Sequence, residues 1–222
     1  MYKHTKRFID IICATIGIAG TSPLWLFAII GILVSDPGNI FYTSTRIGKD
    51  NKPFRMYKFR SMRTAKGADE SSLRADSNRI FAFGKLLRDL KIDELPQLLN
   101  ILNGSMSVIG PRPVANDQKE LFRVDRWNKS AQVPVGLSGP AALYDFIYGD
   151  YITDENEYME KVFPTRRELE VTYVDKQSLG YDTKMVVYTV ICIIYRVFGK
   201  NPDWMLREFI TDAEQSIKEN SL

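Results

Sequence analysis

Residues 8–34 of the chain read FIDIICATIGIAGTSPLWLFAIIGILV, an apolar stretch interrupted only by Asp10 and by Thr21-Ser22-Pro23. At about 1.5 Å per residue, a helix of this length covers about 40 Å, which is enough to cross the hydrocarbon core of a bilayer. A cleaved signal peptide is an alternative. The stretch, however, is longer than a usual signal-peptide core and lacks a clear small-x-small cleavage site. We therefore expect residues 1–36 to form a membrane helix.

Ser22 and Pro23 predict a break in the middle of this helix. Pro23 cannot donate a hydrogen bond to the carbonyl of Ala19, and we expect the Ser22 hydroxyl to bond the carbonyl of Ile18. A helix that enters and leaves by the same face would keep both basic flanks in the cytoplasm, as the positive-inside rule favours. An ordinary single-span anchor with a proline kink remains the alternative. The flanking basic residues are Lys3, Lys6, Arg7, Arg46, Lys49, Lys52 and Arg55.

Composition excludes several classes of function. The chain has 222 residues, 45% of them hydrophobic and 26% charged, as expected for one ordered domain. The net charge of +3 gives no ground for nucleic-acid binding. The two cysteines lie in apolar runs and the single histidine is His4, so neither a disulfide framework, a zinc site nor a histidine-based triad is expected. Catalytic chemistry must therefore use carboxylates, lysines, arginines or a hard metal ion.

The remainder is predicted to be mostly helical with one small β-hairpin, which makes the fold α+β. Alternating residues place strands at 40–45 and 54–59, joined by the polar turn Gly48–Asn51. Apolar residues at helical spacing predict helices over 80–90 and 94–102, the second ended by Gly104. The Gly- and Pro-rich residues 104–113 and 134–140 are read as loops. Further helices are expected over 118–127, 158–173, 183–198 and 203–218. The helix over 183–198 is short for a span, and we expect it in the core or lying at the membrane interface.

Asp93-Glu94 is the strongest candidate for chemistry. Asp93 could be no more than the N-cap of the helix that follows. Alternatively, one carboxylate attacks phosphorus while the other holds Mg²⁺, since a helix N-terminus favours phosphate and Mg²⁺ prefers one or two carboxylates plus substrate phosphates. The pair alone leaves both interpretations open.

Basic residues elsewhere are candidates for binding phosphate. Arg112 lies in Gly110-Pro111-Arg112-Pro113, where two prolines restrict the backbone and pre-order the guanidinium for phosphate. A rigid turn that exposes a solvated arginine is the alternative. Alternation places Lys58 and Arg60 on one side of a strand, where they could meet phosphate or only discourage edge pairing. Lys85 and Arg88 precede Asp93 by one or two helical turns, and a solvated helix face is the simpler alternative for them.

Taken together, these segments resemble the small monotopic phosphoglycosyl transferases, the bacterial sugar transferase family. The resemblance covers most of residues 1–139, and the ordered set is far more specific than any one motif. The matching segments, in the family's order, are 6–10 (KRFID), 21–23 (TSP), 46–48 (RIG), 57–62 (YKFRSM), 83–88 (FGKLLR), 93–98 (DELPQL), 103–107 (NGSMS) and 109–113 (IGPRP).

The resemblance implies a ping-pong reaction. Asp93 would attack the β-phosphate of a UDP-sugar, release UMP and hold the phospho-sugar until a polyprenyl (undecaprenyl) phosphate accepts it. Glu94 would bind Mg²⁺, with Arg88 and Arg112 near the substrate phosphates. The reaction would be the first membrane step of a bacterial glycan pathway.

The same resemblance implies how the chain is organised. Ser22-Pro23 would break a re-entrant helix in the bacterial inner membrane, with the active site on the cytoplasmic face and membrane lipids as partners. We expect a membrane helix over 1–36, a cytosolic catalytic domain over 37–200 and a helical extension over 201–222. A homodimer is compatible with the sequence.

The sequence departs from the family pattern after Gly139. Gly136–Gly139 matches a family turn, but residues 140–145 read PAALYD, and an arginine commonly expected there is absent. Two other functions compete with the transferase. A membrane-anchored scaffold would need Asp93 only as a cap, and a lipid-phosphate hydrolase would use water as the acceptor.

Overall fold

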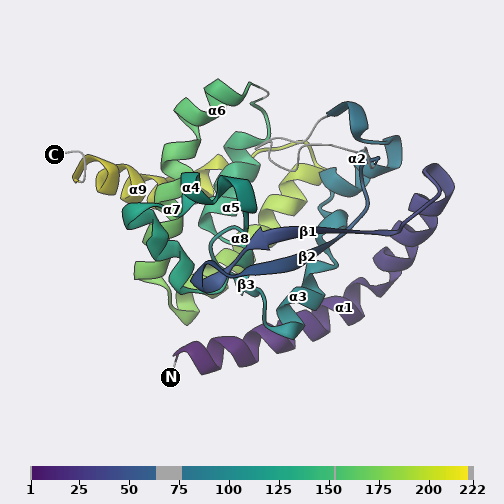
Figure 1. Cartoon of the computed structure of the whole chain (residues 1–222), viewed down its shortest axis with the longest axis horizontal. Coiled ribbons are helices and arrows are strands. Elements are labelled where there is room, and N and C mark those ends of the chain that lie inside the picture. The colour runs from purple at the N-terminus through teal and green to yellow at the C-terminus, as the bar shows by residue number, and fades with distance from the viewer. Residues whose placement is uncertain (1, 64–76, 153, 220–222) are drawn as a thin grey trace.

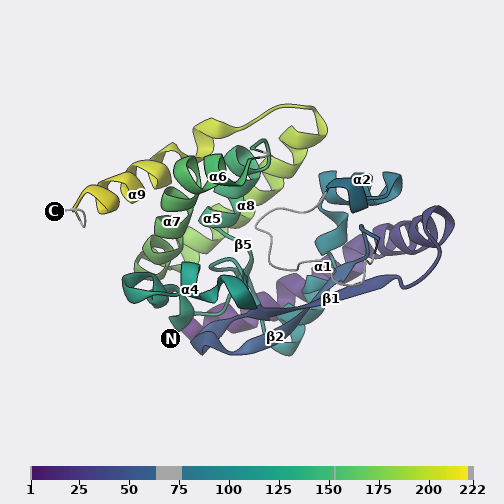
Figure 2. The same ribbon diagram turned by 45° about the horizontal axis from the view of Figure 1, so that its top comes forward.

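The computed structural model describes residues 2–63, 77–152 and 154–219. Two groups of elements lie side by side (Figures 1 and 2). The long helix α1, the hairpin, α2 and α3 form one group, and the helices from α4 to α9 form the other. The prediction of a mostly helical chain with a small sheet is confirmed.

Helix α1 (Tyr2–Ser35) is continuous and contains Pro23. The expected hydrogen bond from Ser22 to Ile18 was wrong, because the Ser22 hydroxyl donates to the carbonyl of Ala19 at 2.9 Å. This carbonyl is the one that Pro23 leaves without a backbone donor. Ser22 therefore satisfies the helix where proline interrupts it. Figure 1 shows that α1 changes direction along its length; whether it re-enters the membrane stays a prediction.

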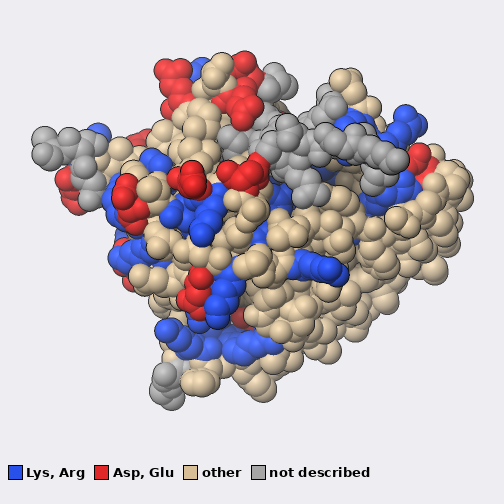
Figure 3. Space-filling view, viewed as in Figure 1, with Lys and Arg blue, Asp and Glu red and all other residues tan. Residues whose placement is uncertain are grey.

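One narrow stripe of α1 packs against the rest of the protein. Lys6, Asp10 and Ala14, and again Ala28 and Ile32, recur at four-residue spacing and are buried. Most of the other apolar side chains of α1 are exposed, and Figure 3 shows a broad uncharged surface at the lower right with Lys and Arg along its borders. In the described part of the chain, α1 is the one helix long and apolar enough to cross a membrane. An exposed surface of this kind favours contact with lipid.

Polar side chains attach the first turns of α1 to the other group of elements. Lys6 pairs with Asp182 at 2.7 Å, and Tyr2 donates to the same carboxylate at 2.8 Å. Asp10 accepts hydrogen bonds from the Ser107 hydroxyl at 3.0 Å and the Val108 backbone at 2.9 Å. The start of α1 is therefore fixed to the fold by buried polar contacts rather than by apolar packing alone.

The described residues form two small sheets, of which the sequence predicted only the β-hairpin. The predicted hairpin forms from β1 (Phe41–Ile47) and β2 (Pro53–Phe59), and β4 (Val114–Ala115) pairs with the other edge of β1. A parallel pair, β3 (Ser107–Ile109) with β5 (Gly136–Ser138), lies in the two segments read as loops. The backbones come very close there, since a methyl group on Gly136 would lie 2.2 Å from the Gly110 nitrogen. Glycine makes this close approach possible. Because glycine is unfavourable in strands, these residues were predicted to be loops.

Most of the observed helices match the predicted ranges, except that two predicted helices are each divided into two elements. Residues 118–127 divide into α4 (Lys119–Phe122) and the 3₁₀ segment η5 (Asp125–Gln132), and residues 158–173 divide between α6 (Glu155–Lys161) and α7 (Phe163–Lys176). The backbone leaves the helical region at Arg123, with φ of −122° and ψ of 42°, which ends α4, and Pro164 opens α7. The others are α2 (Ala82–Asp89), α3 (Gln97–Asn103), α5 (Pro140–Tyr144), α8 (Leu179–Val197) and α9 (Arg207–Glu219).

The C-terminal helix α9 is part of the helical core. Phe209 is buried and contacts the rings of Tyr181 and Tyr188, with centroids 5.2 and 6.3 Å away. The buried carboxylate of Glu168 on α7 accepts hydrogen bonds from Ser216 at 2.6 Å and from Arg126 at 2.9 Å. The extension therefore covers α7 and α8 instead of standing apart from them.

Replacing Gly84 should destabilise the packing of α2. A methyl group there would lie 2.1 Å from the carbonyl oxygen of Ser61, and a backbone atom cannot rotate away. We expect Gly84→Ala to lower the free energy of unfolding by about 1–3 kcal/mol, despite the better helix propensity of alanine. Thermal unfolding of the detergent-solubilised protein measures the change.

The matched control is Gly180→Ala on α8. No atom lies within 4 Å of a methyl group at that position, so the variant should be as stable as the parent or more stable. Equal stability of the parent and Gly84→Ala would contradict the close contact at Ser61.

Candidate active site

Asp93 and Glu94 lie in a 3₁₀ turn, η3 (Ile92–Glu94), between α2 and α3. Among the described residues, neither this turn nor α3 begins with a side-chain cap hydrogen bond. Asp93 is therefore not the N-cap that the simpler interpretation required. Its side chain is nonetheless buried, with the residue only 3% exposed. Burial of a carboxylate without a capping role is costly and is typical of a functional site.

Asn100 on α3 fixes the hairpin beside this turn. Strand β2 is an edge strand, and the Asn100 amide covers that edge. It accepts a hydrogen bond from the Tyr57 backbone at 2.9 Å and donates to the Arg55 carbonyl at 2.7 Å. The amide thus takes the place of a neighbouring strand. The contact holds residue 58 at the level of the Asp93-Glu94 turn.

Lys58 forms an ion pair with Glu94, with 2.8 Å between Nζ and Oε1. Burial alone would raise the pKa of Glu94, but the charges of Lys58, Lys91 and Arg112 outweigh it and hold the pKa well below its ordinary value. Glu94 is therefore ionised at neutral pH. A carboxylate kept ionised among cations is suited to binding a divalent metal.

The pKa of Asp93 shifts in the opposite direction. Burial raises it and the neighbouring Glu94 charge adds to this, while Lys58, Arg88 and Lys91 oppose the shift. Two adjacent carboxylates thus have different environments, one desolvated and one ion-paired. Such a difference is typical of sites where two acids have separate roles.

Lys91 is a site residue that the sequence analysis missed. It sits in the left-handed region with φ of 55°, which turns the chain from α2 into η3. Its ammonium lies 4.8 Å from the ring centroid of Phe146, and its charge lowers the pKa of Glu94. A lysine two residues before a predicted nucleophile was the available signal.

Arg112 reaches the same place from the loop after β3. It is partly exposed, and its charge lowers the pKa of Glu94. On its other side, Nη1 lies 3.6 Å from the Asp145 carboxylate, a second residue that the sequence analysis did not assign. The structure thus brings Lys58, Arg88 and Arg112 around Asp93-Glu94.

Two predicted phosphate ligands have different surroundings. The buried Arg60 guanidinium donates to the side chain and backbone carbonyl of Asp36 and to the carbonyl of Asn39. It ties the segment after α1 to the hairpin, and a phosphate contact would require these bonds to open. Lys85 is exposed on α2.

The donor groups fit Mg²⁺ only in combination with a substrate. Within the described residues, no cluster of three or more His, Cys, Asp or Glu side chains forms. Asp93 and Glu94 offer two carboxylates, one oxygen of which already receives Lys58. Mg²⁺ commonly binds through one or two carboxylates with phosphate oxygens and water completing the octahedron. The pair is therefore compatible with Mg²⁺ that arrives with a phosphorylated substrate.

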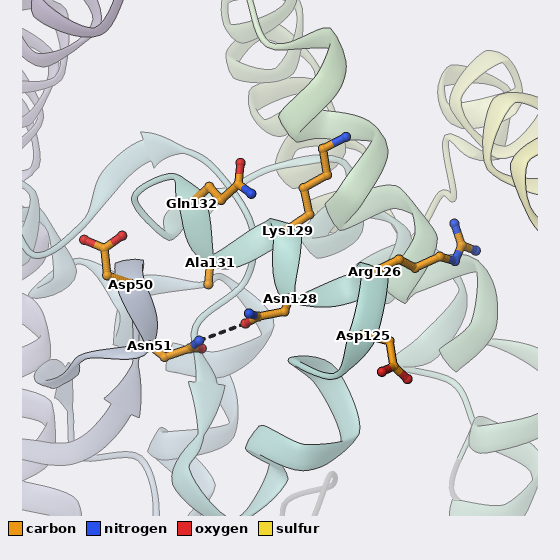
Figure 4. A pocket seen from close by; sticks show the side chains of 8 residues that line it. All are labelled: Asp50, Asn51, Asp125, Arg126, Asn128, Lys129, Ala131 and Gln132. Carbon is orange, nitrogen blue, oxygen red and sulfur yellow. Dashed lines mark hydrogen bonds between the residues drawn. The ribbon is translucent and has the colours of Figure 1, made fainter.

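A shallow hollow of about 470 Å³ lies elsewhere, between the hairpin turn and η5 (Figure 4). Asn51 donates to Asn128 across it at 2.8 Å. None of its lining residues belongs to the group around Asp93. The hollow is lined by Asp50, Asn51, Asp125, Arg126, Asn128, Lys129, Ala131 and Gln132.

Comparison with known proteins identifies the family. The profile of the bacterial sugar transferases matches residues 1–196, which include the whole group around Asp93. The chain belongs to the bacterial sugar transferase family. The resemblance seen in the ordered motifs is thereby confirmed.

Several curated relatives are similar to this chain over most of its length. A UDP-glucose:undecaprenyl-phosphate glucose-1-phosphate transferase of Escherichia coli (strain K12) is 35% identical over 83% of this chain and 39% of its own. A UDP-N-acetylgalactosamine-undecaprenyl-phosphate N-acetylgalactosaminephosphotransferase of Aeromonas hydrophila is 34% identical over 90% of this chain and 45% of its own. The chain thus spans less than half the length of these two relatives. An exopolysaccharide production protein of Rhizobium meliloti (strain 1021) is 38% identical over 85% of each chain.

Proposed function

We propose that this protein transfers a sugar phosphate from a UDP-sugar to a polyprenyl phosphate such as undecaprenyl phosphate. The observation that carries the proposal is the pair Asp93-Glu94. Asp93 is buried without a capping role, and Glu94 is held ionised by Lys58, Lys91 and Arg112. The relatives that are named as UDP-sugar:undecaprenyl-phosphate transferases support this class of substrates.

Asp93 is the proposed nucleophile. Its carboxylate oxygen attacks the β-phosphorus of the UDP-sugar, the bond from that phosphorus to the bridging oxygen breaks, and UMP leaves. An oxygen of polyprenyl phosphate then attacks the same phosphorus and displaces the Asp93 carboxylate, which gives a polyprenyl diphosphate sugar. Lys58, Arg88, Lys91 and Arg112 supply positive charge where the phosphate oxygens gain negative charge.

Glu94 is the proposed ligand of Mg²⁺, with the donor diphosphate supplying further oxygens. When bound, Mg²⁺ neutralises phosphate charge and favours departure of UMP. Lys58 holds Glu94 in place through its 2.8 Å ion pair. The charge of Arg112 also lowers the pKa of Glu94 and so helps to keep the carboxylate ionised.

The membrane arrangement follows from the substrates. A lipid phosphate and a soluble nucleotide can meet only at the surface of a bilayer, and α1 presents an exposed apolar face beside the group around Asp93. We propose that α1 dips into the cytoplasmic leaflet of the bacterial inner membrane and returns, broken at Ser22-Pro23. The Ser22 hydrogen bond to Ala19 lets that break occur in lipid without an unsatisfied carbonyl.

Sequence identity to these relatives does not determine which sugar the donor carries. The relatives from Escherichia coli and Aeromonas hydrophila carry different sugars in their names at 35% and 34% identity. The donor is therefore to be found by experiment.

The test uses purified protein in detergent with Mg²⁺ and a panel of UDP-sugars, without any lipid acceptor. We expect UMP release of about one equivalent and a phospho-sugar adduct on the peptide that contains Asp93, seen by mass spectrometry. Added polyprenyl phosphate should discharge the adduct and restore turnover.

Steady release without an acceptor would instead identify a hydrolase that uses water. No release and no adduct with any donor would favour the scaffold. Retention of biological function by Asp93→Ala would separately identify the scaffold, since that role does not need the nucleophile.

A further inference from the structure

Asp145 is the carboxylate that lies beside the guanidinium of Arg112. Its Oδ2 is 3.6 Å from Nη1 of Arg112 and 3.7 Å from Nη1 of Arg166. Its Oδ1 accepts a hydrogen bond from the hydroxyl of Tyr158 at 2.7 Å. The side chain of Asp145 is 14% exposed and that of Arg112 is 38% exposed. Arg112 therefore faces the open site, and Asp145 supports it from within.

The backbone that carries Asp145 is unusual. Residues 145–149 form one turn of π-helix, η6 (Asp145–Gly149), directly after α5. Turns of this kind are rare and occur often at functional sites. The turn also packs closely, since a methyl group on Gly149 would lie 2.3 Å from Oδ1 of Asp145. The carboxylate is therefore held against its own backbone.

Two cations hold this turn against the rest of the site. Arg196 on α8 stacks on Phe146 at 4.4 Å and pairs with Asp150 at 2.7 Å. The Lys91 ammonium lies 4.8 Å from the centroid of the same ring. This contact links the residues before Asp93 to the π-helical turn that carries Asp145. The position of Asp145 relative to η3 is thus fixed by contacts on both sides.

We propose that Asp145 is a positioning residue that holds Arg112 toward the donor phosphates and away from Glu94. This inference rests on the proposed function, because it assumes a phosphate-bearing donor. The guanidinium of Arg112 lies 3.6 Å from Asp145, and its charge also acts on Glu94. Without the charge of Asp145, it would move onto Glu94 and occupy the carboxylate proposed to bind Mg²⁺. Residues 140–145, where the chain departs from the family pattern, would thus supply the residue that positions Arg112.

The charges around Asp145 are consistent with this role. Burial alone would raise the pKa of Asp145, but Arg166, Arg112 and the Tyr158 hydroxyl outweigh it and hold the pKa below its ordinary value. Asp145 is therefore ionised while Arg112 is present. Arg166 is buried and cannot reach the open site, so Arg112 is the member of the pair that can meet a substrate.

The test measures donor binding in an Asp93→Asn background, where turnover cannot interfere. Titration calorimetry gives the Kd of the UDP-sugar that is active in the donor panel, with full-length protein and Mg²⁺. Asp145→Asn keeps the shape and the acceptor for Tyr158 but removes the charge. We expect it to raise the donor Kd about tenfold or more, since a displaced phosphate ligand can cost up to about a hundredfold.

Tyr158→Phe is the control for a merely structural role. It removes the hydrogen bond that the Tyr158 hydroxyl donates to Asp145 and the one that it accepts from Arg166. The charges of Asp145 and Arg112 stay, so we expect the donor Kd to change less than about threefold. A rise as large as that of Asp145→Asn would show that packing of the turn is what matters, and would overturn the proposal.

A double-mutant cycle tests whether Asp145 acts through Arg112. We expect Asp145→Asn to add nothing once Arg112→Gln is present, because residues that act through one contact are not additive. If Asp145→Asn alone unfolds, the donor Kd of the double variant is compared with that of Arg112→Gln, and a further rise in Kd would overturn the proposal. An unchanged donor Kd in Asp145→Asn, or full additivity with Arg112→Gln, would overturn the proposal. If the Asp93→Asn protein binds no UDP-sugar at all, the proposed function itself fails.

Discussion

Asp93→Asn should lower the rate of sugar-phosphate transfer by about 10³-fold or more while the protein stays folded. An amide preserves the shape of the side chain but cannot attack phosphorus as a carboxylate does. The substitution also removes a buried charge whose pKa is raised by desolvation, so we expect no loss of stability. UMP release and the phospho-sugar adduct are measured together with thermal unfolding.

Asp89→Asn is the matched control. Asp89 is exposed at the end of α2, four residues before Asp93, and the same substitution there should leave transfer unchanged. Turnover of Asp93→Asn at the rate of this control would show that Asp93 is not the nucleophile. Loss of activity in both variants would point to a general effect of charge near η3.

Glu94→Gln should lower kcat/KM by about 10²–10³-fold, the range found when a group that stabilises developing charge is removed. The loss has two expected causes. The proposed metal loses a ligand, and Lys58 loses the partner that it holds at 2.8 Å. The apparent affinity for Mg²⁺ should fall, and an excess of Mg²⁺ should restore only part of the rate. A Mg²⁺ titration of the initial rate measures both quantities.

Two further variants separate these causes. Glu157→Gln removes an exposed carboxylate that also pairs with a lysine, and it should leave the Mg²⁺ dependence unchanged. Lys58→Gln with Glu94→Gln removes both charges of the pair. If the double variant regains most of the lost rate, the unpaired lysine and not the metal explains the effect of Glu94→Gln.

The sequence predicted the elements whose signals are local. Alternation located the hairpin, and helical spacing located α2 and α8. It missed the parallel pair of β3 and β5, because Gly110 and Gly136 allow a close backbone approach yet read as loop residues. It also missed the break between α6 and α7, where Pro164 starts a new helix inside one apolar pattern.

The residues of the candidate site likewise include some that a local sequence pattern predicts and others that only the structure reveals. Asp93, Glu94 and Arg112 belong to short motifs that any reading of the chain can find, and Lys58 follows from strand alternation. Lys91 and Asp145 matter through contacts over long sequence separations, such as the ring of Phe146 for Lys91. Arg60 belongs to a recognisable motif, but its partner does not. It pairs with Asp36, which directly follows α1 and is not marked by any sequence pattern. Local patterns thus identify candidate residues, but only the fold shows what each one contacts.

The packing of α1 has a consequence for how this protein can be handled. Among the described residues, two of the three hydrophobic clusters include α1 side chains: Ala14 packs with Leu98 and Ile101, and Ile32 packs with Phe59 and Ile92. We therefore expect deletion of residues 1–36 to expose apolar side chains of both clusters and to destabilise the fold around η3. Helix α1 and the elements that carry Asp93 thus share one interior, so a shortened protein should not keep the geometry of the candidate site.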